Sequence, residues 1–104
     1  MMGAGPEMNI SKASTPQFME LFAEWCPPCK QMKPILDDLE KTYKDKVKFM
    51  RVDIDKNPDT AKKFKVDAIP VQLFFDKDGK LVFKHVGFYS KADIIAQFKK
   101  MGVE

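Results

Sequence analysis

The pattern of apolar and polar positions predicts four strands and three helices. Short runs that are mostly apolar, or that alternate, and that are rich in large or β-branched side chains are typical of strands. Four such runs occur, at residues 18–23, 47–53, 71–75 and 80–86. Apolar residues that recur every three or four positions indicate an amphipathic helix. This second pattern occurs at residues 27–43, 58–64 and 90–101.

Local signals mark where several of these elements begin or turn. Asn57-Pro58 is typical of a helix start, with Asn as the N-cap and Pro at the first helical position. Ser90 with Asp93 three residues later forms a capping-box pattern, and residues 76–79 predict a hairpin turn. The order β-α-β-α-β-β-α therefore predicts an α/β fold with a mixed four-stranded sheet and helices on both faces. Its first two strands are parallel and joined by a right-handed crossover.

The N-terminal residues carry a weaker signal. Residues 1–16 are predicted to be an extension of a single domain formed by residues 17–104, and the stretch from Glu7 to Ala13 is compatible with a short helix. No run approaches the ~20 apolar residues of a membrane span. The start of the chain also lacks the apolar core of a secretory signal. We therefore expect a cytoplasmic protein, or a periplasmic or extracytoplasmic one if the chain is a mature or trimmed fragment.

Composition narrows the class of partner. The 104 residues are 44% hydrophobic and 32% charged, which is typical of a globular domain. The net charge of +3 comes from 18 basic and 15 acidic residues. Their signs are interleaved, as in residues 37–46, and we find no basic block of the kind that follows a phosphate backbone. We expect no nucleic-acid partner.

The two cysteines lie close together at the start of a predicted helix, in Trp25-Cys26-Pro27-Pro28-Cys29. A disulfide that closes so short a loop adds little stability, because this stabilisation grows with the length of the loop. The N–H groups and dipole of the helix start favour the thiolate of Cys26. Cys29 follows one turn later, within disulfide reach, and is expected to be the more buried. The pattern predicts reversible thiol–disulfide exchange.

Cysteines with this spacing also occur in zinc sites. His85 is the only histidine, so a metal clip would need ligands from a partner chain. His85 itself lies on the second strand of the predicted hairpin and is expected to be a surface or edge residue. We expect neither a metal nor a cofactor.

Glu20 lies in the middle of an apolar strand. Burial disfavours the ionised carboxylate and raises its pKa, which would suit a proton acceptor for Cys29 near neutral pH. The alternative is a glutamate that reaches solvent. Arg51, on the next predicted strand, is either a charge partner of this carboxylate or a solvated residue.

The order of elements and the place of the cysteine pair resemble the thioredoxin family. The resemblance covers about residues 18–101. Its motifs are residues 23–30 around the cysteines, Pro34 in the following helix, residues 53–58, Ala68-Ile69-Pro70 before the third strand and Val86-Gly87 after the fourth. The family implies the thioredoxin fold and protein-disulfide reductase activity. It also implies disulfide-containing protein substrates and an upstream donor, either a reductase of the thioredoxin reductase type or a membrane thiol donor.

The resemblance also implies roles for individual residues. Cys26 would be the attacking nucleophile and Cys29 the resolving thiol. Pro70 would be a cis proline that faces the pair, exposes the preceding backbone to substrate and keeps metal ions from bridging the thiols. The residues implied to bind substrate are Trp25, Pro27, Pro28, Ile69, Pro70, Gly87 and Phe88.

Three features depart from the family pattern. Only about seventeen residues precede the first predicted strand, so the family's first strand is expected to be missing and one sheet edge to be unpaired or covered in another way. The family's buried aspartate is Glu20 here. The cysteines enclose Pro27-Pro28, as in tryparedoxin and nucleoredoxin, where thioredoxin usually has Gly-Pro, which leaves the reduction potential open.

Three functions are compatible with these residues. The first is a general thiol–disulfide oxidoreductase that reduces protein disulfides as a monomer. The second is an extracytoplasmic redox partner of the cytochrome c maturation type. The third is a thioredoxin-like binding module whose thiols are not used. We expect the first.

Overall fold

The computed structural model describes residues 9–104 and contains four strands and three helices in the predicted order. The strands are β1 (Gln17–Phe22), β2 (Lys48–Asp53), β3 (Val71–Phe75) and β4 (Leu81–Val86). The helices are α1 (Pro27–Thr42), α2 (Pro58–Lys63) and α3 (Lys91–Lys100). The four strands and three helices predicted within residues 18–101 are all present, with ends that differ by one residue at most.

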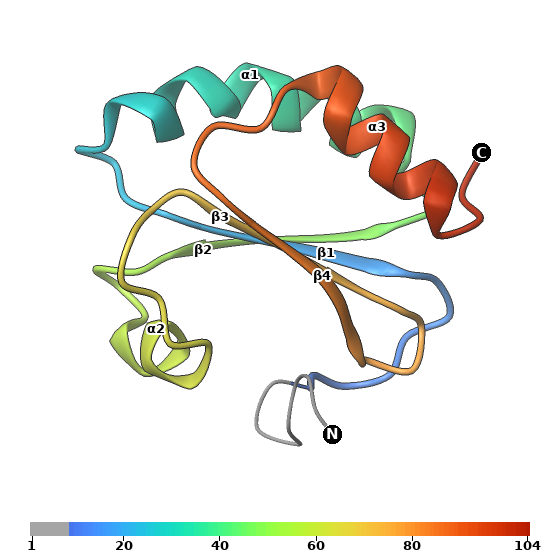
Figure 1. The fold of residues 1–104 in the computed structure, drawn as a ribbon, viewed down its shortest axis with the longest axis horizontal. Helices are drawn as coiled ribbons and strands as arrows, with labels where there is room; N and C mark the ends of the chain where they lie inside the picture. Colours follow the sequence, from blue (N-terminus) through green and yellow to red (C-terminus); the bar gives the residue numbers. More distant parts are fainter. Residues whose placement is uncertain (1–8) are drawn as a thin grey trace.

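The four strands form one mixed sheet in the order β2-β1-β3-β4. β1 pairs in parallel with β2, whereas β3 is antiparallel to both β1 and β4. Figure 1 shows α1 and α3 on one face of the sheet and α2 on the other. The predicted mixed four-stranded sheet with helices on both faces is confirmed.

An apolar core lies on each side of the sheet. Alternate residues of a strand point to opposite faces, so Phe18 packs toward α1 and α3 while Met19 and Leu21 pack on the α2 side. The larger core contains Phe18, Met32, Leu36, Leu39, Tyr43, Val47, Phe74, Ile94, Phe98 and Val103. Because both faces are covered, β1 and β3 are apolar almost throughout, as expected of central strands.

On the face covered by α1 and α3, side chains in register form two rows across the sheet. The aromatic row consists of Phe49, Phe18, Phe74 and Phe83. Two residues closer to the cysteine pair on every strand, the polar row consists of Arg51, Glu20, Gln72 and His85. The polar row is the nearer of the two to the cysteine pair, because β1 runs from Gln17 toward Phe22 and the cysteines follow it.

The N-terminal segment is not helical in its described part, so the expectation of a short helix is wrong for residues 9–13. Instead, the Ile10 N–H donates to the Gly79 carbonyl at 2.9 Å and the Ala13 N–H donates to the Lys77 carbonyl at 2.8 Å. A side chain on Gly79, whose φ is 85°, would collide with the Ile10 carbonyl. Pairing with the hairpin turn satisfies backbone groups that a short, marginal helix would satisfy only weakly. Glu7 and Met8 lie outside the described residues.

No strand precedes β1 within residues 9–104, and β2 forms one edge of the sheet, so the expected absence of the family's first strand holds for this part of the chain. The segment that pairs with the hairpin turn lies at the β3–β4 turn and does not pair with β2 in the described residues.

The helix caps match the sequence at one of two predicted positions. The Ser90 hydroxyl accepts the Asp93 N–H at 3.1 Å and caps α3 as predicted. Asn57 does precede α2, but its side chain makes no capping bond. Its amide donates to the Asp53 carbonyl at 3.0 Å, because the loop that leaves β2 offers this competing acceptor. Among residues 9–104, no helix is long and apolar enough to cross a membrane.

Candidate active site

Cys26 and Cys29 lie at the junction of β1 and α1 and are joined by a disulfide, with their Cα atoms 5.2 Å apart. Cys26 is the N-cap of α1, and Pro27 begins the helix without an N–H to satisfy. The backbone N–H of Cys29 donates to the Cys26 Sγ at 3.3 Å. The predicted contact between an N–H of the first turn and the first sulfur is confirmed. An N–H and a helix dipole placed in this way favour negative charge on a cysteine sulfur.

Burial does not distinguish the two cysteines. Cys26 is 3% exposed and Cys29 is 5% exposed, so the expectation that Cys29 is the more buried is wrong in this disulfide-bonded structure. Both belong to one apolar cluster with Ala23, and Ile69 from the loop before β3 packs against it. Cys29 differs in that it also lines a cavity. The two cysteines are therefore distinguished by the helix N–H on Cys26 and the cavity beside Cys29.

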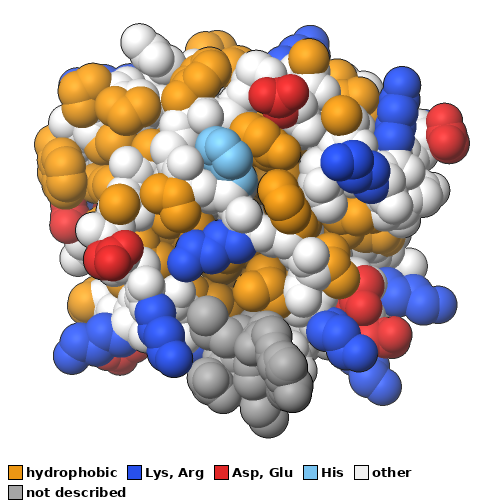
Figure 2. Space-filling model, viewed as in Figure 1, with side chains coloured by type: hydrophobic (Ala, Val, Ile, Leu, Met, Phe, Trp, Pro, Cys, Tyr) orange, Lys and Arg blue, Asp and Glu red, His pale blue; other side chains and the backbone are white. Residues whose placement is uncertain are grey.

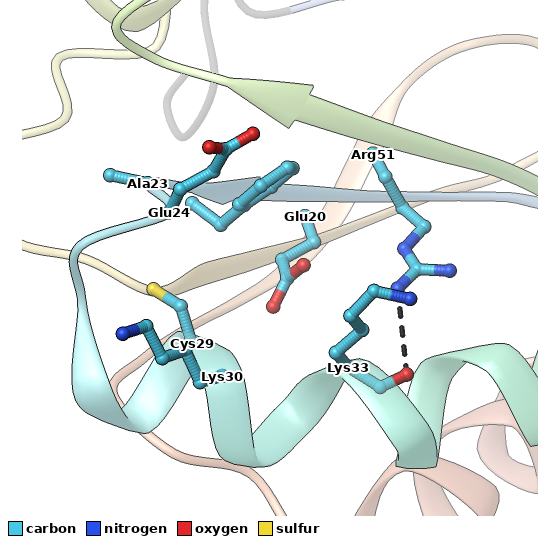
Figure 3. A pocket seen from close by; sticks show the side chains of 8 residues that line it. Glu20, Ala23, Glu24, Cys29, Lys30, Lys33 and Arg51 are labelled. Atoms are coloured by element: carbon cyan, nitrogen blue, oxygen red, sulfur yellow. Dashed lines mark hydrogen bonds between the residues drawn. The ribbon is translucent and has the colours of Figure 1, made fainter.

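The cavity has a volume of about 410 Å³ and includes Cys29, Glu20, Lys33 and Arg51 in its walls. Figure 3 shows the Glu20 carboxyl between β1 and α1, on the same side of the sheet as the Cys29 sulfur. The carboxyl of Glu20 and the second cysteine therefore border the same cavity.

Glu20 is buried, with 3% of its surface exposed. Burial raises the pKa of its carboxyl from 4.5 to about 7, and the positive charge of Arg51 opposes this only in part. Its Oε2 atom has no hydrogen-bond partner in the described structure. The expectation of a buried carboxyl with a raised pKa is confirmed, and the alternative of a solvent-reaching side chain is excluded.

Arg51 stands opposite Glu20 in the β1–β2 register, but its guanidinium turns toward α1. It lies 2.7 Å from Asp37 Oδ1 and 3.3 Å from Glu40 Oε1. It also lies 3.5 Å from the Lys33 carbonyl oxygen, a contact that Figure 3 marks with a dashed line. Its hydrogen bond, together with that of Lys33, lowers the pKa of Asp37. Of the two expected alternatives, Arg51 is a charge partner of Glu20, because its positive charge acts on that carboxyl although no hydrogen bond joins them.

Two loops meet next to the disulfide. The Ile69–Pro70 peptide is cis, as the resemblance implied. Ile69 packs against the cysteine cluster, and the Pro70 carbonyl accepts the Gly87 N–H at 2.7 Å. Gly87 has a φ of 99°, a conformation that favours glycine. The loop before β3 is therefore tied to the loop after β4.

The remaining residues of the implied substrate groove are accessible. Trp25 is 64% exposed and its indole N–H donates to Asp55 Oδ2 at 2.8 Å. Phe88 is 45% exposed. Pro27 is exposed and Pro28 is half-buried. Their accessibility is compatible with substrate binding, which stays a prediction.

Gln72 is a site residue that the sequence analysis missed. It is 0% exposed, and its side-chain amide donates to the Gly87 carbonyl at 3.0 Å and to Met32 Sδ at 3.2 Å. Its Oε1 lies 2.7 Å from His85 Nδ1. One signal could have identified it, because Gln72 is the only polar residue in an apolar run and the hairpin register places it opposite His85.

His85 is on the edge strand β4, as expected, but it is half-buried. Its ring stacks on Tyr89 with centroids 3.9 Å apart. Figure 2 shows the histidine at the surface among hydrophobic side chains. The expectation of a surface or edge residue is therefore confirmed for the position of His85. Its contacts with Gln72 and Tyr89 were not predicted.

Comparison with known proteins identifies the family that the sequence motifs resemble. The family model for thioredoxin matches residues 6–100. A thioredoxin of Pseudomonas aeruginosa is 39% identical over 90 residues, which cover 86% of this chain and 82% of that protein. A thioredoxin of Staphylococcus aureus is 41% identical over 78 residues, covering 75% and 74%.

Solved structures show the same fold. Mitochondrial thioredoxin 3 from Saccharomyces cerevisiae, in its oxidised form, superposes with a TM-score of 0.74 at 35% identity, covering 86% of this chain and 81% of that one. A malarial protein superposes with a TM-score of 0.78 at 32% identity, covering 84% and 97%.

These likenesses agree with the geometry of the site. The disulfide at the start of α1, the mixed sheet and the thioredoxin relatives establish a thiol–disulfide oxidoreductase. The family implies protein disulfides as substrates and a reductase as partner. With a family model that matches most of its length and relatives close to 40% identical, the chain belongs to the thioredoxin family.

Proposed function

We propose that this protein works as a disulfide reductase in which Cys26 attacks and Cys29 resolves. The Cys26 thiolate attacks one sulfur of a substrate disulfide, that S–S bond breaks, and the first substrate sulfur leaves as a thiolate. Cys29 then loses its proton and attacks the Cys26 sulfur. The mixed disulfide breaks, the second substrate thiol is released, and the Cys26–Cys29 disulfide remains.

The observation that carries this assignment is the N–H of Cys29 on the Cys26 Sγ, at 3.3 Å at the start of α1. It favours negative charge on Cys26 over Cys29, because only the first sulfur occupies the N-cap position. The attacking thiol is the one whose thiolate is stabilised, and the second thiol waits until the mixed disulfide has formed.

Glu20 is proposed as the proton acceptor for Cys29. Its pKa of about 7 leaves a substantial fraction ionised at neutral pH, which is the range in which a carboxylate is effective as a general base. Both residues line the same cavity, so the proton passes directly or through water inside it. Arg51 does not block this role, since its hydrogen bonds go to α1.

Substrate polypeptide is proposed to bind across the two loops beside the disulfide. The backbone at Ile69, before the cis Pro70, would pair with an extended segment of substrate. Trp25 and Phe88 are exposed apolar side chains that would contact its flanking residues, and Pro27 and Pro28 would form the rim next to Cys26. We further propose a monomer in the cytoplasm, re-reduced by an upstream reductase of the thioredoxin reductase type.

The two cysteines serve as controls for each other in a test with insulin as substrate and dithiothreitol as donor. We expect Cys26→Ser to abolish insulin reduction, because no attacking thiolate is left. We expect Cys29→Ser to lose turnover but to retain attack, so that a mixed disulfide accumulates and can be detected by mass spectrometry. Full activity of Cys26→Ser would contradict the proposal and favour a binding module.

The reduction potential of the Cys26–Cys29 couple tests the direction of the reaction. A disulfide reductase should lie near thioredoxin, at about −270 mV, and far from a strong oxidant at about −120 mV. Equilibration in graded dithiothreitol buffers measures it. A value well above about −200 mV would mean that the site works as an oxidant or isomerase.

A further inference from the structure

The loop that connects β4 to α3 presents an exposed phenylalanine between two restrained neighbours. Phe88 is 45% exposed. On one side of it, Gly87 uses its N–H on the Pro70 carbonyl, at 2.7 Å, and its carbonyl on the Gln72 amide, at 3.0 Å. On the other side, the Tyr89 ring stacks on His85 at 3.9 Å, with an angle of 18° between the planes.

One pair of side chains contributes a restraint on each side of Phe88, since Gln72 holds the Gly87 carbonyl and His85 stacks on Tyr89. Gln72 Oε1 and His85 Nδ1 lie 2.7 Å apart. The Gln72 amide N–H groups are taken up by Gly87 and Met32, so Gln72 Oε1 is the acceptor and His85 Nδ1 is the donor. One buried amide therefore joins β3, β4, the loop after β4 and α1.

This pair stands in an unusual place for polar groups. Gln72 is 0% exposed, on the sheet face whose neighbouring row is entirely aromatic. Removing one partner of a buried hydrogen bond leaves the other unsatisfied and destabilises the folded protein. An apolar residue at this position would avoid that liability but could not hold the Gly87 carbonyl.

We propose that Gln72 and His85 are positioning residues that hold Phe88 ready to recognise polypeptide substrates. The inference rests on the disulfide reductase function proposed above. A recognition side chain that is already fixed does not lose conformational freedom when substrate binds. The effect concerns substrates large enough to reach Phe88. A small aromatic disulfide needs only the sulfur of Cys26 and is insensitive to it.

The test compares two buried glutamines of the same chain. Gln72→Leu removes the amide that holds the loop. Gln17→Leu is the matched control, because Gln17 is 1% exposed and its amide donates to the Ser11 carbonyl at 2.9 Å. Gln17 stands at the end of β1 away from the cysteines. Insulin and 5,5′-dithiobis(2-nitrobenzoate) serve as the large and the small disulfide, and thermal unfolding is measured for both variants.

We expect Gln72→Leu to raise the KM for insulin by roughly 5- to 10-fold, as the loss of one internal hydrogen bond predicts. Its kcat for insulin, its rate with the small disulfide and its reduction potential should stay at wild-type values. Gln17→Leu should lower the melting temperature to a similar degree without changing either substrate's kinetics. The inference is overturned if insulin and the small disulfide respond alike, if neither responds, or if both variants behave in the same way.

A second variant, His85→Phe, tests the same inference if Gln72→Leu does not fold. His85→Phe retains a ring that can stack on Tyr89 but removes the hydrogen bond to Gln72, and we expect a smaller rise in the KM for insulin alone. An unchanged KM would overturn the inference. A wild-type protein that reduces neither probe would instead contradict the proposed function, so the two failures are distinguishable.

Discussion

The aromatic row and the polar row lie two residues apart on the same face of one sheet, the face covered by α1 and α3. The first consists only of phenylalanines, whereas the second consists only of polar and charged side chains. In the aromatic row, Phe18 stands 5.2 Å from Phe49 and 5.0 Å from Phe74, measured between ring centroids. In the polar row, Glu20 has an unpartnered oxygen and borders a cavity. A shift of two residues toward the cysteines thus changes the sheet from a packed core to a set of buried polar groups.

The buried polar side chains of Glu20 and Gln72 lie in the row beside the disulfide, and the aromatic row away from it contains no polar side chain. Aromatic rings in edge-to-face contact contribute burial and a further ~0.5–1.5 kcal/mol per pair, and Phe98 of α3 extends the row's packing. A buried carboxyl without a partner is destabilising when charged. The costly groups are gathered next to the disulfide, where a titratable carboxyl and a positioned loop are useful.

The largest effect should come from breaking the aromatic row. Phe18→Ala removes a fully buried ring at its centre, and we expect the free energy of unfolding to fall by ~3–5 kcal/mol. Urea denaturation measures the loss. At a temperature where the variant is folded, its insulin reduction per folded molecule should match the wild type, since the ring contacts of Phe18 are with Phe49, Phe74 and Phe98, none of which belongs to the site. A specific loss of activity at full folding would show that the two rows are not independent.

The polar row should respond to pH instead. Folding raises the pKa of Glu20 from 4.5 to about 7. Between these values the unfolded chain has lost a proton that the folded chain still holds, so stability falls as pH rises and is constant above the folded pKa. The fall amounts to about 3 kcal/mol for a single buried carboxyl.

Glu20→Gln should remove this pH dependence and slow insulin reduction, because no proton acceptor is left for Cys29. Unfolding of the oxidised protein at several pH values measures the first effect. Glu24→Gln is the control, since Glu24 borders the same cavity but is exposed, and it should keep the wild-type slope. If Glu20→Gln kept that slope too, the titrating group would be a different one.

Arg51 should produce the smallest change and sharpen the account of Glu20. Its positive charge lowers the pKa of Glu20, so Arg51→Met should move the Glu20 midpoint to higher pH and widen the range over which stability falls. Carbon-13 NMR titration of the Glu20 carboxyl measures the shift. Lys33→Met removes the other partner of Asp37 and should leave the Glu20 midpoint in place. A downward shift in Arg51→Met would contradict the assigned sign.

Local residues sufficed to predict most of the elements and the centre of the site. Cys26, Pro27 and Cys29 act within one helical turn, so their contact follows from α1 itself. The turn at residues 76–79 is equally local, because Asp76 Oδ1 accepts the N–H groups of Asp78 and Lys80 within it. Burial of Glu20 followed from the apolar run that surrounds it.

Contacts between distant segments decided the rest. The N-terminal segment pairs with a turn more than sixty residues away, which no local pattern could indicate. The Arg51 guanidinium faces several acidic groups, and only the approach of α1 to β2 selects Asp37 and Glu40 over Glu20. In the sequence, Gln72 is a single polar residue in an apolar strand. Its partners Gly87 and His85 become evident only when the strand register and the loop after β4 are known.

The order of the elements, the redox pair and the buried carboxyl beside it can all be predicted from the amino-acid sequence, because each depends on residues a few positions apart. The partners of the buried polar side chains depend instead on how the elements pack. This pairing depends on the distances between segments that only packing brings together, since hydrogen bonds and desolvation act over a few ångströms while the chain positions involved are far apart.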